Sequence, residues 1–116
     1  MIKVDIDEAS AFDMLAILHI KKGKGNEIAS ESYVSLARLI EDHLGAALFS
    51  RVLRSDTYMD LISANNLVFD YVDILNTGET KVISASDVHR ANMARFSFKK
   101  LLQERFFTDP LTEQKI

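Results

Sequence analysis

The feature of this sequence that most constrains its fold is a pair of long segments in which apolar residues recur every three or four positions. One segment spans residues 56–76 and the other spans residues 87–107. The repeats consist of Tyr58, Leu61, Asn65, Val68, Val72 and Leu75 in the first segment, and of Val88, Ala91, Arg95, Phe98, Leu102 and Arg105 in the second. This spacing lines up side chains along one face of a helix, as in the seam of a helical bundle. We therefore predict two amphipathic bundle helices.

Each seam contains a polar side chain between apolar neighbours, Asn65 in the first and Arg95 in the second. Because an unpaired buried charge costs several kcal/mol, we expect Arg95 to meet a carboxylate or carbonyl groups. Asp70 and Asp73 on the neighbouring helix are the predicted partners. The favoured interpretation is that the polar residues fix helix register and association state, as a seam asparagine does in coiled coils. The alternative is a ligand-binding cluster, for which the candidates are Asn65, Asp70, Asp73, Asn92 and Arg95.

Three shorter segments extend the helical prediction, with helices expected over residues 8–22, 26–44 and 46–53. The glycines of the run 23–26 and Gly45 are suited to helix ends, because glycine accepts a positive φ. Residues suited to N-caps precede three of the helices: Asp7 for the first, Ser55 or Asp56 for the fourth, and Ser86 or Asp87 for the last. The predicted fold is mainly α, an antiparallel bundle of four to five helices in a single domain over residues 1–116.

Two segments fall outside this helical pattern. Residues 2–6 alternate apolar and polar side chains, and residues 80–84 include Val82 and Ile83, so a short two-stranded β ribbon between 2–6 and 80–84 is possible. Residues 108–116 are polar, follow the last helix and lack periodicity, so we predict a tail or an arm there.

The composition limits the classes of function. The 116 residues include no cysteine, which excludes disulfides, thiolate zinc sites and cysteine nucleophiles. The net charge of -3 disfavours nucleic-acid binding, because the field of the whole molecule repels phosphates. No apolar run reaches the length of a membrane span, about 20 residues, and the start lacks the pattern of a secretion signal. We expect no membrane association and a cytoplasmic location.

Metal and cofactor sites are not expected either. His19, His43 and His89 do not show the spacing that fixes two metal ligands on one helix, so core or interface histidines are favoured. The Asp70-x-x-Asp73 pair resembles in part the motif of helical magnesium-dependent nucleotide pyrophosphohydrolases. Those enzymes also need a Glu-x-x-Glu run, which this sequence lacks, so the pair is expected to be a solvated helix face. We predict no cofactor and lean against an enzyme.

Several motifs resemble a family of small uncharacterised bacterial and phage proteins, which is a domain of unknown function. The stretch Val4-Asp5-Ile6-Asp7-Glu8 followed by residues 13–21, Asp-Met-Leu-Ala-Ile-Leu-His-Ile-Lys, is similar to the family's short strand and its Asp-Lys-Leu-Thr-Ile-Leu-Glu-Ile-Lys helix. Residues 65–73 resemble its Asn-x-x-Leu-Trp-Asp-x-x-Asp motif, and the likeness continues at Ala91-Asn92-x-x-Arg95-x-x-x-Lys99 and in the tail residues 113–115.

This resemblance implies a helical fold, an environmental bacterial or phage origin and a recurring polar set, but no reaction. The set comprises Asp13, Asn65, Asp70, Asp73, Asn92, Arg95 and Lys99. The sequence departs from the family at His19, where the family has glutamate, and at Phe69, where it has tryptophan. Residues 23–54 match little, and the missing glutamate further weakens a metal interpretation.

Additional apolar residues favour self-association. Met93, Phe96 and Phe107 form a second apolar stripe on the last predicted helix, roughly opposite its seam. A chain of this length has limited capacity to cover helices on two sides, so we predict a homodimer. The leading prediction is a non-catalytic helical protein that acts through self-association and protein contacts. A small enzyme or ligand-binding protein using the polar cluster, for example one resembling the metal-dependent phosphohydrolases, is the second hypothesis, and nucleic-acid binding is the third.

Overall fold

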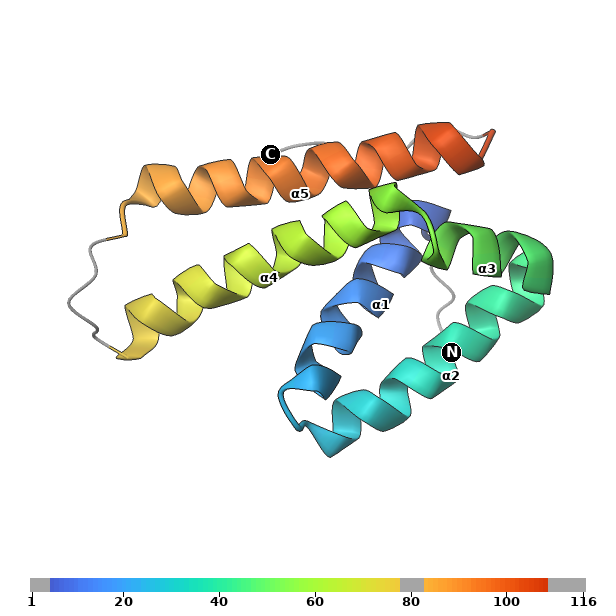
Figure 1. The fold of residues 1–116 in the computed structure, drawn as a ribbon, viewed down its shortest axis with the longest axis horizontal. Helices are drawn as coiled ribbons and strands as arrows, with labels where there is room; N and C mark the ends of the chain where they lie inside the picture. Colours follow the sequence, from blue (N-terminus) through green and yellow to red (C-terminus); the bar gives the residue numbers. More distant parts are fainter. Residues whose placement is uncertain (1–4, 78–82, 109–116) are drawn as a thin grey trace.

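The computed structural model describes residues 5–77 and 83–108, and in these residues the protein is mainly α-helical. The helices are α1 (Glu8–Gly23), α2 (Glu27–Leu44), α3 (Ala46–Leu53), α4 (Asp56–Thr77) and α5 (Ala85–Phe106). Helices α4 and α5 form an antiparallel hairpin, α1 and α2 form a second antiparallel pair, and the short α3 connects α2 to α4 (Figure 1). The predicted helical bundle is therefore confirmed.

The predicted β ribbon is not seen. Residues 5, 6, 83 and 84 form no strand, and the rest of 2–6 and 80–84 lies outside the described residues, as does the predicted tail beyond residue 108. The described residues at both places lead into helices instead. Asp7 is the N-cap of α1, and Ser84 is the N-cap of α5.

The start of α5 differs from the prediction because a capping box fixes it two residues earlier. The Ser84 hydroxyl accepts a hydrogen bond from the Asp87 N–H at 3.2 Å, and the Asp87 carboxylate accepts one from the Ser84 N–H at 3.0 Å. These two bonds satisfy backbone donors that the first turn of a helix otherwise leaves unpaired. Asp87, predicted as a possible N-cap, is thus the third residue of the helix.

The turn between α2 and α3 depends on a glycine. Gly45 has φ 88°, a left-handed conformation that residues with a Cβ rarely adopt. Its N–H donates a 2.7 Å hydrogen bond to the carbonyl of Glu41, which ends α2, and α3 begins at the next residue. The predicted stop of the second helix at Gly45 is confirmed.

The core forms around Phe12 of α1, whose side chain is fully buried. Its ring centroid lies 6.0 Å from that of Phe49, 5.9 Å from that of Tyr58 and 6.3 Å from that of Phe107. Helix α1 contacts α2, α4 and α5, so it is the central element of the described fold. Burial of such aromatic and aliphatic side chains, about 1.5–3 kcal/mol each, is the main force holding the pairs together.

The hairpin of α4 and α5 extends beyond the rest of the bundle. The end of α4 and the start of α5 project past α1 and α2 along the long axis of the molecule (Figure 1). The radius of gyration is 15.1 Å, compared with about 13 Å for a compact chain of this length. Much of the hairpin surface is therefore left without cover by the other helices. No helix in the described part of the chain is long and apolar enough to cross a membrane.

Candidate functional site

The polar residues of the two seams meet at Asp13, a buried carboxylate on α1. Asn65 of α4 donates a 2.9 Å hydrogen bond from Nδ2 to Asp13 Oδ1. The guanidinium of Arg95 on α5 lies 3.1 Å from Asp13 Oδ2. One carboxylate therefore binds both helices of the hairpin to α1, and the prediction that Arg95 meets a carboxylate is confirmed, although that carboxylate is neither Asp70 nor Asp73.

Asn65 has little freedom in this position. Its side chain is almost fully buried, and Nδ2 also donates a 3.0 Å hydrogen bond to the carbonyl of Leu61 one turn earlier on α4. Burying an amide without hydrogen bonds costs a few kcal/mol, so these contacts make its burial tolerable. The helix phasing predicted from the seam is correct, because both Asn65 and Arg95 face the interior.

Lys99 extends the polar set by one helical turn. It is only 4% exposed, and burial lowers the pKa of its ammonium group. The carboxylates of Asp13 and Asp7 oppose this effect, whereas the charge of Arg95 adds to it. Two cations of α5 therefore lie in the field of one buried carboxylate. Lys99 was singled out only by the family resemblance.

Gln103 completes this polar stripe and was missed by the sequence analysis. Its side chain is fully buried, its Oε1 accepts a 2.9 Å hydrogen bond from the N–H of Ala9, and its Nε2 donates to Glu8 at 3.1 Å. Gln103 thus satisfies a backbone donor in the first turn of α1. The available signal was the four-residue spacing of Arg95, Lys99 and Gln103, which puts polar side chains on one face of α5.

Three predicted site residues lie apart from this cluster. Asp73 pairs with Lys24 at 3.2 Å, and both of these side chains are largely exposed. Asp70 is exposed. Asn92 is also exposed and donates a 3.2 Å hydrogen bond to the carbonyl of Val88 on its own helix. The structure therefore brings together Asn65 and Arg95 from the predicted cluster, adds Asp13 and Lys99, and leaves out the other three.

The histidines do not occupy the core. His19, His43 and His89 are all exposed, and the ring of His19 lies 6.2 Å from that of Tyr33. Among residues 5–77 and 83–108, no group of three or more His, Asp or Glu side chains is arranged to hold a metal ion. The prediction is therefore wrong for core histidines in the single chain, and that of interface histidines stays a prediction.

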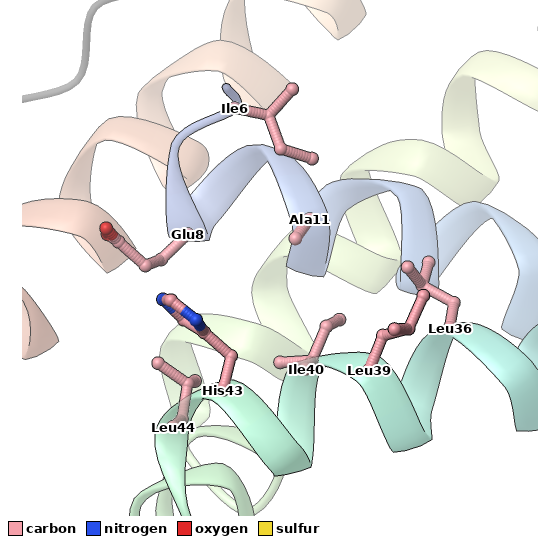
Figure 2. Close-up of a pocket in the computed structure, with 8 residues that line it drawn as sticks. All are labelled: Ile6, Glu8, Ala11, Leu36, Leu39, Ile40, His43 and Leu44. Carbon is pink, nitrogen blue, oxygen red and sulfur yellow. The ribbon is translucent and has the colours of Figure 1, made fainter. Parts of the chain in front are cut away.

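An apolar groove lies between the start of α1 and the second half of α2 (Figure 2). It has a volume of about 280 Å³ and is lined by Ile6, Glu8, Ala11, Leu36, Leu39, Ile40, His43 and Leu44. Figure 2 shows the two polar members, Glu8 from α1 and His43 from α2, together at one end, with the leucines and isoleucines along the rest. The groove can therefore bind an apolar group and offers hydrogen-bonding groups at one end.

A second hollow lies between the two helices of the hairpin. It has a volume of about 300 Å³ and is lined by Leu67, Tyr71, Asp87, Arg90, Ala91 and Ala94. Arg90 forms an ion pair of 3.1 Å with Asp87 one turn away, so this hollow mixes apolar and paired charged side chains. It is more polar in character than the groove on α1 and α2.

The fold and the buried cluster define a small helical-bundle protein in which the ion pair of Asp13 and Arg95 links α1 to α5. Comparison with protein-family models, with curated proteins and with solved structures finds no match to this chain. The resemblance to the bacterial and phage family therefore stays a prediction.

Proposed function

We propose that this protein is non-catalytic and acts through self-association and contacts with other proteins. The observation that carries the proposal is the number of large apolar side chains that are exposed to solvent. In the described residues these are Ile6, Met14, Ile28, Val34, Leu39, Met59, Leu67, Val72, Leu75 and Leu101. Exposed apolar surface of this kind is typical of sites that associate with another molecule when it forms a continuous patch.

The buried polar cluster supports the same proposal. Asp13, Asn65 and Arg95 make their hydrogen bonds and ion pair with one another, so their polar atoms serve to hold α1, α4 and α5 in register. Polar side chains inside a bundle specify which helices pair and at what level. Such a scaffold presents its outer helix faces in a defined arrangement, and the cytoplasm stays its predicted location.

The test is the mass of the full chain in solution. We expect multi-angle light scattering at tens of micromolar to give twice the chain mass of 13.1 kDa, with dissociation on dilution. A constant mass of one chain across this range would reject self-association. Retention on heparin that falls with salt would instead favour the third hypothesis, nucleic-acid binding.

Binding of a small amphiphile is the second candidate function, and the groove of Figure 2 favours it. A short alkyl amine could place its chain along Leu39 and Ile40 and its ammonium group at Glu8. We expect octylamine to shift the NMR signals of these residues, and Leu39→Glu to abolish the shifts. Shifts confined to Asp13, Asn65 and Arg95 would favour the predicted ligand cluster in place of the groove.

A further inference from the structure

The groove of Figure 2 includes a residue through which the chain enters α1. Ile6 lines the groove and lies two positions before Glu8, the first residue of the helix. Between them, Asp7 has φ -65° and ψ 150°, which is an extended conformation. The chain therefore reaches α1 in an extended conformation, and its last apolar side chain before the helix lies at the groove.

The groove offers apolar surface for which a cover is favourable. Two of its large aliphatic side chains are exposed to solvent, since Leu39 is 67% exposed and Ile6 is 53% exposed. Its volume of about 280 Å³ is slightly below the range of about 300–1,000 Å³ that is typical of pockets for drug-sized ligands. A few aliphatic side chains therefore fill it, whereas a whole helix, about 10 Å across, does not fit inside.

The residues that precede Ile6 repeat its apolar character at every second position. Ile2 and Val4 are apolar, whereas Lys3 and Asp5 are charged. In an extended chain, alternate side chains point to the same side. When the extended conformation continues towards residue 2, Ile2 and Val4 share the side of Ile6, which is the side of the groove. Asp5 is exposed, as this alternation requires.

The length of this segment matches the length of the groove. From Leu36 to Leu44 the groove follows eight residues of α2, which is about 12 Å at 1.5 Å per residue. The four steps from Ile2 to Ile6 span about 13 Å in an extended chain. The segment is therefore long enough to cover the apolar part of the groove.

We propose that residues 2–4 of this chain bind the groove between α1 and α2, with the side chains of Ile2 and Val4 packed on Leu39 and Ile40. Residues 1–4 lie outside the described residues, and the contact is inferred from the groove, from Ile6 and from the sequence pattern. This inference goes beyond the proposed function and does not depend on self-association. It makes the segment a built-in competitor of any amphiphile that binds the same groove.

Covalent attachment favours this occupant over a separate molecule. A second copy or a free amphiphile loses translational and rotational freedom when it binds, whereas a segment joined to Ile6 is already held beside the groove. A short tether gives an effective concentration in the millimolar range. A separate molecule therefore needs a comparable concentration, or a higher affinity, to displace the segment.

Nuclear Overhauser effects between methyl groups test the contact directly in the full chain. We expect such effects between Val4 and both Leu39 and Ile40. An isotope-filtered experiment on a mixture of labelled and unlabelled chains separates contacts within one chain from contacts between two chains. Effects within one chain support the proposal. Their absence, or effects between chains only, overturns it.

A matched pair of variants on α2 provides a second measurement. Leu39→Ala removes part of the proposed contact surface and should shift the methyl signals of Val4. Val34→Ala is the control, because Val34 is exposed on the same helix and lies about 120° around it from Ile40. Val34→Ala should leave the signals of Val4 in place. Equal shifts in both variants overturn the proposal.

Competition with octylamine measures how completely the segment covers the groove. The double variant Ile2→Ser, Val4→Ser keeps the length of the segment and removes its apolar groups. When the segment covers the groove in nine chains out of ten, its removal raises the open fraction about tenfold, and the dissociation constant of octylamine should fall by about the same factor. The control is Ile28→Ser, Met59→Ser, which removes exposed apolar side chains that do not line the groove and should leave the constant unchanged.

The outcomes separate this inference from the proposed function. Tighter binding of octylamine in the Ile2, Val4 variant alone supports the inference, and equal binding in all the proteins overturns it. When octylamine binds none of them, the small-amphiphile function is rejected and the methyl contacts decide the inference. None of these measurements depends on the mass of the protein in solution, so failure of the inference leaves self-association standing.

Discussion

Asp13 binds Asn65 through one carboxylate oxygen and Arg95 through the other, so a single side chain of α1 holds both helices of the hairpin. The carboxylate is 6% exposed and the Arg95 side chain is 30% exposed. Because the pair is shielded from water, loss of one partner leaves a charge that solvent cannot easily stabilise. The consequences for stability are therefore larger than those of a surface pair.

Arg95 and Arg90 allow the effect of burial on the strength of an ion pair to be measured within one helix. Each lies 3.1 Å from an aspartate, but Arg90 is mostly exposed and its partner is Asp87 one turn away. We expect Arg95→Met to lower the free energy of unfolding by about 3 kcal/mol, because Asp13 stays buried without its cation. Arg90→Met should change it by less than about 1 kcal/mol. Urea denaturation followed by circular dichroism measures both, and equal effects would contradict the role given to Asp13.

Asn65→Asp tests the second contact of the same carboxylate. The substitution removes an amide donor 2.9 Å from Asp13 and puts a second carboxylate there. We expect a loss of about 2–4 kcal/mol at neutral pH. Repulsion raises the pKa of the new carboxyl group in the folded state, so the lost stability should return as the pH falls through that pKa.

The matched control for this variant is Asn66→Asp, one residue further along α4. Asn66 is exposed, so its replacement should leave the free energy of unfolding almost unchanged at every pH. A similar loss in both variants would mean that the helix itself, and not the contact with Asp13, is sensitive to the added charge.

The helices could be predicted from the sequence because their signals are local. The three-and-four spacing of residues 58–75 and 88–105 depends only on neighbours within a turn or two, and the inward direction of Asn65 and Arg95 follows from it. The start of α5 was misplaced because Ser84, Ser86 and Asp87 can all serve as N-caps. The choice among them depends on backbone geometry that the residue types do not reveal.

The partners within the buried cluster could not be predicted from spacing alone. The partner of Arg95 depends on the position of α1 along the hairpin. That position is set by the packing of all three helices together. Asp70 and Asp73 were favoured because they lie on the next helix, and Asp13 was singled out only by the family resemblance. Gln103 shares a face of α5 with Arg95 and Lys99, but its hydrogen bond to Ala9 depends on where α1 packs against that face.

At Lys99 we predict a substitution that stabilises the protein, in contrast to those at Arg95 and Asn65. Burial lowers the pKa of its ammonium group, which means that the charged form is disfavoured in the folded protein relative to the unfolded one. We expect Lys99→Met, which keeps most of the length of the side chain without the charge, to raise the free energy of unfolding by up to about 1 kcal/mol at neutral pH. Lys21→Met, at an exposed position of α1, should have little effect.

The pH dependence of the free energy of unfolding distinguishes the removal of a buried charge from a gain in packing at position 99. A lysine with a lowered pKa in the folded state makes stability rise as the pH climbs from that pKa towards the ordinary value of 10.5. The unchanged protein should show this rise in alkaline urea titrations, and Lys99→Met should lack it. The same alkaline slope in both proteins would assign the effect to other groups.

The capping box of α5 allows a test that combines stability with titration. The Ser84 backbone and side-chain hydrogen bonds, followed by the nearby charge of Arg90, lower the pKa of Asp87 below its ordinary value of 3.8. We expect Ser84→Ala to raise this pKa towards 3.8, which NMR titration of the Asp87 carboxyl measures directly. Loss of the N-cap hydroxyl should also destabilise the protein by about 1 kcal/mol.

The sign of the pH effect follows from the same hydrogen bonds. Because the carboxylate form of Asp87 is favoured in the folded state, its stabilisation is complete above the ordinary pKa and is lost as the pH falls through the lowered one. Ser84→Ala should therefore differ less from the unchanged protein in strong acid than at neutral pH. Ser86→Ala is the control, because Ser86 is exposed and lies inside α5. An equal pKa change in both variants would contradict the capping box between Ser84 and Asp87.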